Sequence, residues 1–342
     1  MNPTWRSFLV SADAAFDGDT HELLHFGDAA AELQAARQQT VLVPLTHLAI
    51  MEATGDDAKP FLHSQLTSDI NHLGEAQAQH SGWCTAKGRM QASFLIWRHG
   101  ADYRMAYAAD LVDGAQKRLQ MFILRSKAKL ANRTDDILLL GVAGPQAAEA
   151  LADAGLAAPE APLALQSAGE IAVIRVDGDR FIVALPEAAK ADLWQKLSAK
   201  ARPAGLPVWR WLDIQAGLPL VTLATKEEFV PQMADFEKIG GVSFHKGCYP
   251  GQEIVARTQY LGKVKRHLFR VVSATEPKAG DDLFSPDNPD QACGKIVSAA
   301  PSPNGGFEAL AVIQSNFAGN VELGARGGPK IQTSPVNPLP AE

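Results

Sequence analysis

The sequence predicts an α+β protein with a duplicated hairpin-and-helix unit followed by a small antiparallel β-barrel. Apolar and polar residues alternate at 93–98 and 103–108, with a helical pattern directly after them, which indicates a hairpin followed by a helix. The same order returns at 171–176 and 181–185, again before a helical pattern, which suggests a duplication. Beyond residue 262, short strand-like runs separated by Pro, Gly and Asn are typical of a barrel or sandwich.

The same patterns predict where the domains begin and end. Residues 1–39 are acidic and rich in alanine and are expected to form an N-terminal appendage. Residues 40–261 hold the two related α+β subdomains, 262–328 the barrel, and 329–342 a loose, proline-rich tail.

Within the first subdomain, two short apolar runs and a helical pattern follow one another. The runs at 41–43 and 48–51, separated by Pro44, are predicted to be paired strands. A helix containing Phe61, Leu62 and Leu66 is expected after them.

The composition is that of an ordinary globular protein, with 342 residues, 46% hydrophobic and 20% charged. The longest apolar run is too short to cross a bilayer, and the N-terminus lacks the pattern of a signal or transit peptide. We therefore expect a cytoplasmic monomer without membrane contact. The net charge of −6 argues against nucleic-acid binding over the whole surface, and no direct nucleic-acid binding is expected.

The cysteines exclude a disulfide framework, because there are only three and no Cys-x-x-Cys pair. No self-contained metal site is predicted, and an iron–sulfur cluster would have to be shared with another chain. Cys84 and Cys293 lie in strand-like runs, where a free cysteine usually behaves as a small buried hydrophobic residue.

Cys248 has a different setting, in a stretch with glycines at 240, 241, 247 and 251. Lys246 lies two residues away, which in an extended segment places the ammonium on the same side as the sulfur. A helix starting near Gly251 would also favour the thiolate through its N-terminal amides. Cys248 is thus predicted to be a nucleophile or a transient metal ligand; the alternative is a buried turn cysteine.

The motif Lys-Gly-Cys-Tyr-Pro-Gly-Gln-Glu at 246–253, preceded by Gly-Gly-Val-Ser-Phe at 240–244, resembles the signature of the YgfZ-type folate-binding family. These proteins are relatives of the glycine-cleavage T-protein, an aminomethyltransferase. Further matching segments occur in the family's order at 65–69, 86–90, 209–217 and 229–232. The resemblance spans roughly residues 40–325.

The resemblance implies a three-part ring of two folate-binding subdomains and a barrel, which binds tetrahydrofolate or a one-carbon derivative. It implies a role in assembling or repairing iron–sulfur clusters in client enzymes, including tRNA-modifying ones. Cys248 would carry the chemistry and Lys246 would hold its thiolate. The supporting motif residues would be Gly247, Tyr249, Gly251, Gln252, Glu253 and Arg257.

Two further expectations concern charged residues after Cys248. Glu253 and Arg257 are predicted to pair at i, i+4 and orient the following turn. Lys263, Lys265 and Arg266 could face the anionic glutamate tail of folate or a client protein.

Five positions are predicted folate contacts from the resemblance: Leu48, Thr67, Lys87, Trp209 and Gln215. Trp209 could stack on a pterin or aminobenzoate ring, or could be a core residue. At Gln215 these families more often carry Glu, and at Leu48 a tryptophan, so binding is expected to be weaker or differently arranged.

The sequence leaves open whether the protein is an enzyme. Where T-proteins carry a carboxylate that assists aminomethyl transfer, this chain has Ala92 and Ser93, which removes acid–base assistance worth roughly 10²- to 10⁴-fold. One alternative function is a folate-dependent one-carbon transferase or demethylase. Another is a thiol enzyme acting through Cys248 without folate, with only His245 nearby in sequence as a base.

Overall fold

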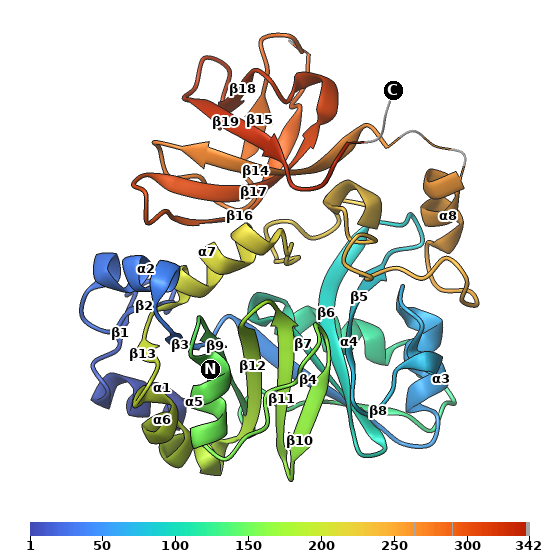
Figure 1. Ribbon diagram of the computed structural model, residues 1–342. Coiled ribbons are helices and arrows are strands. Elements are labelled where there is room, and N and C mark those ends of the chain that lie inside the picture. The colour runs from blue at the N-terminus through green and yellow to red at the C-terminus, as the bar shows by residue number, and fades with distance from the viewer. Residues whose placement is uncertain (261, 263, 289, 340–342) are drawn as a thin grey trace. The chain divides into compact units, whose positions relative to one another are not determined.

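The computed structural model describes residues 1–260, 262, 264–288 and 290–339. Its helices and strands are labelled in Figure 1. Its contacts divide the chain into two compact units. Unit 1 comprises Met1–Phe61, Asn71–Gln79 and Leu95–Trp209. Unit 2 comprises Leu62–Ile70, His80–Phe94 and Arg210–Glu342. The fold is mixed α and β with a closed antiparallel barrel near the C-terminus, which confirms the predicted class.

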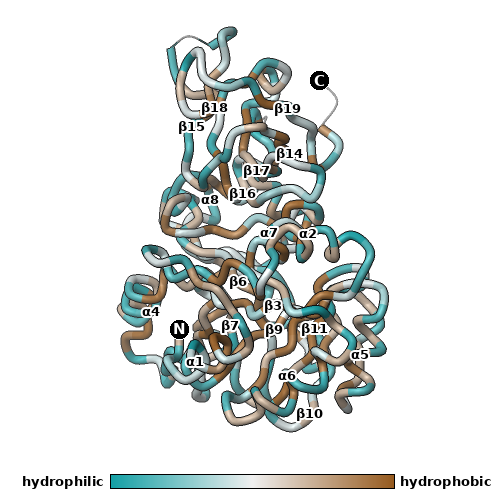
Figure 2. Tube along the Cα trace, turned by 90° about the vertical axis from the view of Figure 1, so that its left-hand side faces the viewer, coloured by the Kyte–Doolittle hydropathy of each residue, from teal (hydrophilic) through white to brown (hydrophobic). Residues whose placement is uncertain are grey.

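Unit 1 contains a six-stranded sheet with the strand order β10-β11-β12-β9-β3-β13. The strands are β3 (Val41–Pro44), β9 (Ile137–Ala143), β10 (Leu165–Ala168), β11 (Ile171–Asp177), β12 (Arg180–Pro186) and β13 (Arg202–Pro203). All pairs are antiparallel except β3 with β13. The β11–β12 hairpin and the following helix confirm the second predicted hairpin-and-helix unit. Figure 2 shows hydrophobic residues along β3 and β9, as expected for buried strands.

Helices α1 (Pro3–Ser11), α5 (Ala147–Asp153) and α6 (Lys190–Ser198) pack on this sheet. Trp5 and Leu9 of α1 are buried in one cluster with Leu140 and Phe181 of the strands. Two short strands and a helix complete the N-terminal region: β1 (Ala15–Phe16), β2 (Leu23–His25) and α2 (Ala29–Gln38). The prediction of an N-terminal appendage is therefore wrong for α1, because burial of its apolar face makes it part of the core.

The other sheet has the strand order β5-β6-β7-β4-β8. Its strands are β4 (Leu48–Thr54), β5 (Ala78–Cys84), β6 (Met90–His99), β7 (Asp102–Ala108) and β8 (Lys129–Asn132), and α4 (Val112–Gln120) follows the β6–β7 hairpin as predicted. The prediction that β3 and β4 pair is wrong. A turn closed by the bond from the Leu48 amide to the Leu45 carbonyl at 3.1 Å lies between the two strands, and they belong to different sheets.

Unit 2 contains the closed barrel, with the strand order β14-β17-β16-β15-β18-β19. The strands are β14 (Arg266–Ser273), β15 (Asp282–Phe284), β16 (Gly294–Pro301), β17 (Phe307–Gln314), β18 (Val321–Leu323) and β19 (Lys330–Pro335). The prediction of a loose tail from residue 329 is wrong for β19, which pairs with β14 and β18. Without β19, strands β14 and β18 would each have an unpaired edge. The backbone hydrogen bonds to these two strands therefore order residues 330–335, although their polar composition suggests a loose segment.

The remaining helices connect these parts of the chain. Two run from one unit into the other, namely α3 (Ala58–Gln65), where a helix was predicted, and α7 (Leu206–Ala216). In unit 2, α8 (Gln252–Tyr260) precedes the barrel. Single turns of 3₁₀-helix lie at Ile70–His72, Ala109–Leu111, Glu187–Ala189, Pro231–Ala234 and Ser315–Phe317. None of the helices in the described part of the chain is long and apolar enough to span a membrane.

Candidate functional site

Exposure distinguishes Cys248 from the other two thiols. Cys248 is exposed, whereas Cys84 and Cys293 are buried, as their strand-like surroundings predicted. Burial raises the pKa of the Cys84 thiol to about 12 and also raises the pKa of Cys293. The alternative that Cys248 is a buried turn cysteine is therefore wrong. Of these three thiols, Cys248 is the one that an external reagent or partner can reach.

The loop that carries Cys248 is attached to the rest of unit 2 through Thr67. The Thr67 hydroxyl donates to the Gly241 carbonyl at 2.6 Å and accepts from the Gly82 amide at 2.7 Å. The Ser243 amide donates to the Thr67 carbonyl at 2.9 Å. Since Thr67 is fully buried, these bonds are shielded from water and hold the segment before Cys248 in one position.

Lys246 anchors the loop at the C-terminal end of α3. Its ammonium donates to the carbonyls of His63 and Leu66 and lies 5.0 Å from the centre of the Tyr249 ring. A cation is favourable at a helix C-terminus, where carbonyl groups lack intrahelical partners. Burial lowers the pKa of Lys246 to about 8, although Asp69 and Cys248 oppose the shift. The ammonium is thus held by α3, two residues before Cys248 in the chain.

Close backbone packing brings the Cys248 motif against the turn at residues 85–89. Gly251 has φ +83°, and a Cβ there would lie 2.4 Å from the Thr85 carbonyl oxygen and 2.7 Å from the Gly88 Cα. Only glycine fits such a position. Helix α8 begins at the next residue, and its Val255 carbonyl accepts from the Gln232 side chain at 2.7 Å. The predicted helix after Cys248 is therefore present and fixed at its first turns.

The motif's other side chains are placed as follows. Tyr249 is buried, and this burial raises the pKa of its hydroxyl. The Gln252 amide donates to the Lys246 carbonyl at 3.3 Å. The predicted Glu253–Arg257 pair does not occur among the described residues: both side chains are exposed and neither takes part in an ion pair. Water solvates such exposed charges well, so pairing gains little.

His63, which the sequence did not single out, lies beside the cysteine loop. Its Nε2 atom lies 3.8 Å from the position of a Cβ built on Gly247, and its Nδ1 lies 3.3 Å from Asp69 Oδ1. The imidazole thus lies between the Asp69 carboxylate and the residue before Cys248. No local pattern joins residues so far apart in the chain, so the sequence alone indicates only His245 as a nearby base.

Several of the residues predicted to contact folate have side chains that are buried or already bonded within the protein. In unit 1, Leu48 is half-buried, whereas Trp209 is 2% exposed, packs against Gly141 and has the Arg180 guanidinium 5.1 Å from its ring centre. Trp209 is thus a core residue, the alternative that its pattern had left open. In unit 2, the Thr67 hydroxyl is used within the fold and Lys87 is exposed.

Gln215 is engaged by the barrel residue Glu308. Its side chain donates to Glu308 at 2.6 Å, and Trp211 and Ser302 donate to the same carboxylate at 3.1 and 2.7 Å. Burial opposes ionisation of Glu308, but the three hydrogen bonds together lower its pKa. The amide expected to bind a pterin is therefore bonded within unit 2.

The positions of the missing transferase carboxylates are also buried. Ala92 is fully buried, and the Ser93 hydroxyl accepts a bond from the Val221 amide at 3.0 Å. Ser93 thus has a structural role and supplies no carboxylate. In the described ranges, no group of three or more His, Cys, Asp or Glu could hold a metal ion.

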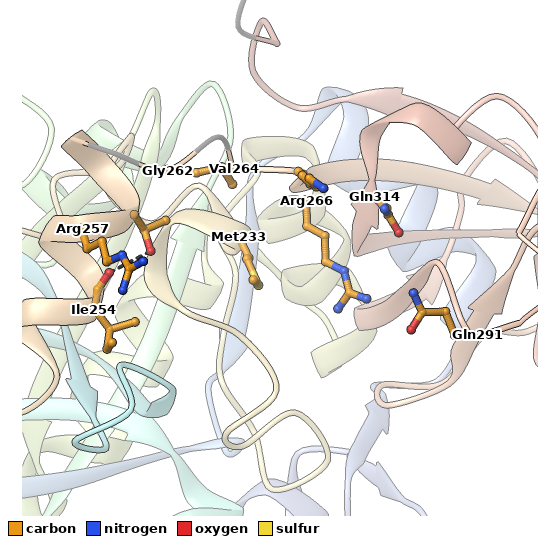
Figure 3. A pocket seen from close by; sticks show the side chains of 10 residues that line it. Met233, Ile254, Arg257, Gly262, Val264, Arg266, Gln291 and Gln314 are labelled. Atoms are coloured by element: carbon orange, nitrogen blue, oxygen red, sulfur yellow. Dashed lines mark hydrogen bonds between the residues drawn. The ribbon is translucent and has the colours of Figure 1, made fainter.

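A pocket of about 520 Å³ lies within unit 2 between α8 and the barrel (Figure 3). The residues lining it are Met233, Ile254, Arg257, Thr258, Gly262, Val264, Lys265, Arg266, Gln291 and Gln314. Figure 3 shows Arg257 on the α8 side, Arg266 with the two glutamines on the barrel side, and Met233 between them. Of the predicted cations, Lys265 and Arg266 line this pocket, and Lys263 lies outside the described residues.

Comparisons with known proteins show the family and the fold of the chain. The GCVT N-terminal domain family matches residues 20–237. A protein of Cronobacter sakazakii named tRNA-modifying protein YgfZ is 30% identical over 311 residues, covering 90% of this chain and 94% of that protein. The chain belongs to the YgfZ family. The YgfZ protein of Klebsiella pneumoniae is 33% identical over 253 residues, covering 73% of this chain and 77% of its own length.

A solved structure extends the likeness to the fold of almost the whole chain. The aminomethyltransferase T of the glycine cleavage system of Bartonella henselae has a TM-score of 0.79 and 21% identity, covering 98% of this chain and 97% of its own. This YgfZ-family chain thus shares its fold with an aminomethyltransferase, while Ala92 and Ser93 stand where the sequence resemblance expects acidic residues.

Proposed function

We propose that this YgfZ-family protein binds tetrahydrofolate and supports the assembly or repair of iron–sulfur clusters in client enzymes, including tRNA-modifying ones. The chemistry would pass through the Cys248 thiol. The relatives' name, tRNA-modifying protein, supports the choice of clients. The cluster is cargo in this proposal, because a single thiol supplies too few ligands to retain one.

The observation that carries the proposal is an exposed thiol on a firmly held loop. Thr67, Lys246 and Gly251 attach the loop at three places, yet none of these contacts covers Cys248. A structural cysteine would be buried, as the other two are. A positioned but accessible sulfur suits transient contact with a partner.

The folate part rests on the family and the fold, not on the side chains first expected to bind the ligand. The GCVT domain and the aminomethyltransferase fold support a folate-type ligand. Thr67, Trp209 and Gln215 are not proposed as contacts, since their polar or aromatic groups are used inside the protein. Lys87, which is exposed on the turn that packs against Gly251, stays a proposed contact.

Aminomethyl transfer is a weaker candidate. Ser93 uses its hydroxyl to bind the Val221 amide and cannot replace a carboxylate that assists proton transfer. No observation in the described residues favours that reaction over a thiol-based role.

Complementation tests the thiol. Cells lacking the endogenous protein would receive wild type, Cys248→Ser or the matched control Cys293→Ser, and the activity of an iron–sulfur tRNA-modifying enzyme would be measured. We expect Cys248→Ser to lose at least about tenfold of the restored activity and Cys293→Ser to keep it, provided that both accumulate normally. Full activity with Cys248→Ser would refute the proposed role of the thiol.

Thermal unfolding with reduced folate tests the ligand. Tetrahydrofolate at 100 times its Kd would stabilise the folded protein by about 2.7 kcal/mol. Lys87→Gln should reduce the shift without changing the unfolding temperature of the free protein. No shift in wild type would remove folate from the proposal and leave the thiol role standing.

A further inference from the structure

We propose that the pocket between α8 and the barrel is a docking site for an acidic segment of a partner protein. The inference rests on the proposed function, because this partner would be the client that Cys248 serves. It adds the place on the surface and the chemistry by which a client is recognised.

The first argument is an imbalance of charge. Three cations line the pocket, Arg257, Lys265 and Arg266, and no Asp or Glu is among its described lining residues. None of the three forms an ion pair with any residue that the structure describes. On a chain with a net charge of −6, three cations gathered without internal partners form a local field that attracts a carboxylate from outside.

The second argument concerns the rest of the lining, which suits a polypeptide. Met233, Ile254 and Val264 offer apolar surface, and the side-chain amides of Gln291 and Gln314 can both donate to and accept from a peptide backbone. The described lining has no aromatic ring on which a nucleic-acid base could stack. Cations beside apolar and amide groups therefore favour an acidic peptide with interspersed apolar side chains.

The third argument is proximity to the thiol. Arg257 and Ile254 belong to α8, which begins at Gln252, four residues after Cys248. Ile254 and Tyr260 also leave apolar surface exposed on the same helix. A segment held along α8 would keep its parent protein near Cys248, which raises the effective concentration of the client at the sulfur.

Fluorescence anisotropy with two labelled peptides tests the proposal. One peptide alternates Glu-Glu-Leu, and the other has the same pattern with Lys in place of Glu. The variant is Arg257→Gln/Lys265→Gln/Arg266→Gln. The control removes three exposed cations of unit 1, Lys59→Gln/Lys117→Gln/Arg125→Gln, and thus changes the net charge equally.

We expect wild type and the control to bind the acidic peptide with similar, salt-sensitive Kd values and the pocket variant to bind at least tenfold more weakly. The single variant Arg257→Gln should lose about threefold and provides the same test if the triple variant does not fold. Equal binding by pocket variant and control would overturn the proposal, as would absence of peptide binding by wild type.

Two competitors separate the other sources of anionic charge. Transfer RNA or polyglutamylated folate could displace the peptide and also bind the pocket variant more weakly than the control. That ligand would then occupy the pocket, and the proposal would fail. The Cys248→Ser protein should bind the peptide like wild type. If the peptide does not bind but Cys248 is essential in the complementation test, the docking proposal fails and the proposed function stands.

Discussion

Two regions of unit 2 gather polar side chains in different ways. In the Cys248 loop, Thr67 and Lys246 use their polar atoms on backbone groups and leave the sulfur exposed. Where α7 meets the barrel, Gln215, Trp211 and Ser302 all donate hydrogen bonds to the Glu308 carboxylate, so these polar groups are used within the fold. Both regions contain residues that the sequence resemblance singles out, but only the first retains an accessible reactive atom. A side chain can serve a ligand only if the fold has not already used it.

The largest effect expected from a single change is at Gly251. Gly251→Ala should destabilise the protein by about 3 kcal/mol, since the new methyl would overlap the Thr85 carbonyl and the backbone is left-handed. The matched control is Gly240→Ala, where φ is also positive but nothing lies within 4 Å, and the cost should be about 1 kcal/mol. Urea unfolding measures both, and equal losses would show that the 85–89 turn does not fix the loop.

The next largest effect is expected at Lys246. Lys246→Met leaves the His63 and Leu66 carbonyls without their donor, which should cost about 2 kcal/mol. Methionine avoids the burial of charge that lowers the lysine pKa, so a larger loss is not expected. The exposed Lys265→Met is the control and should change the free energy of unfolding by less than about 0.5 kcal/mol. If both variants unfold alike, Lys246 is not the anchor of the loop.

The barrel contact is tested by introducing at position 215 the carboxylate that the sequence resemblance leads us to expect. Gln215→Glu would place two carboxylates together, because the Gln215 nitrogen lies 2.6 Å from Glu308. We expect a loss of about 1–2 kcal/mol at neutral pH, of which Glu308→Gln in the same chain should recover at least half. Additive losses in the double variant would mean that the two side chains do not interact in solution.

The smallest expected effect is on the reactivity of Cys248. Iodoacetamide should modify Cys248 in the folded protein and spare Cys84 and Cys293, because these are buried. His63→Gln should slow the reaction at neutral pH by about threefold to tenfold if the imidazole assists proton removal. His245→Gln is the control and should react like wild type. Mass spectrometry follows the modification; unchanged kinetics in His63→Gln would remove the histidine from the site.

Local patterns predicted much of the fold and the location of the candidate site. Alternation identified both hairpins, short strand-like runs after residue 262 indicated the barrel, and the contexts of Cys84 and Cys293 predicted their burial. The pattern failed for β19, whose composition is polar, and for β3 and β4, whose neighbourhood in sequence suggested a pairing that does not form. Strand partners are chosen by packing and register across the sheet, which local alternation does not encode.

The sequence by itself determined that Cys248 lies on a glycine-bent loop followed by a helix, since glycine and helix propensities act through neighbouring residues. Only the tertiary structure decided which side chains surround that loop. The Thr67–Gly241 and Lys246–Leu66 bonds join residues 174 and 180 positions apart, and His63 lies beside Gly247 across a similar distance in the chain. The same long-range packing buries Trp209 and places the Gln215 side chain where it donates a hydrogen bond to Glu308. Such contacts depend on how distant segments fold together, and no local pattern records them.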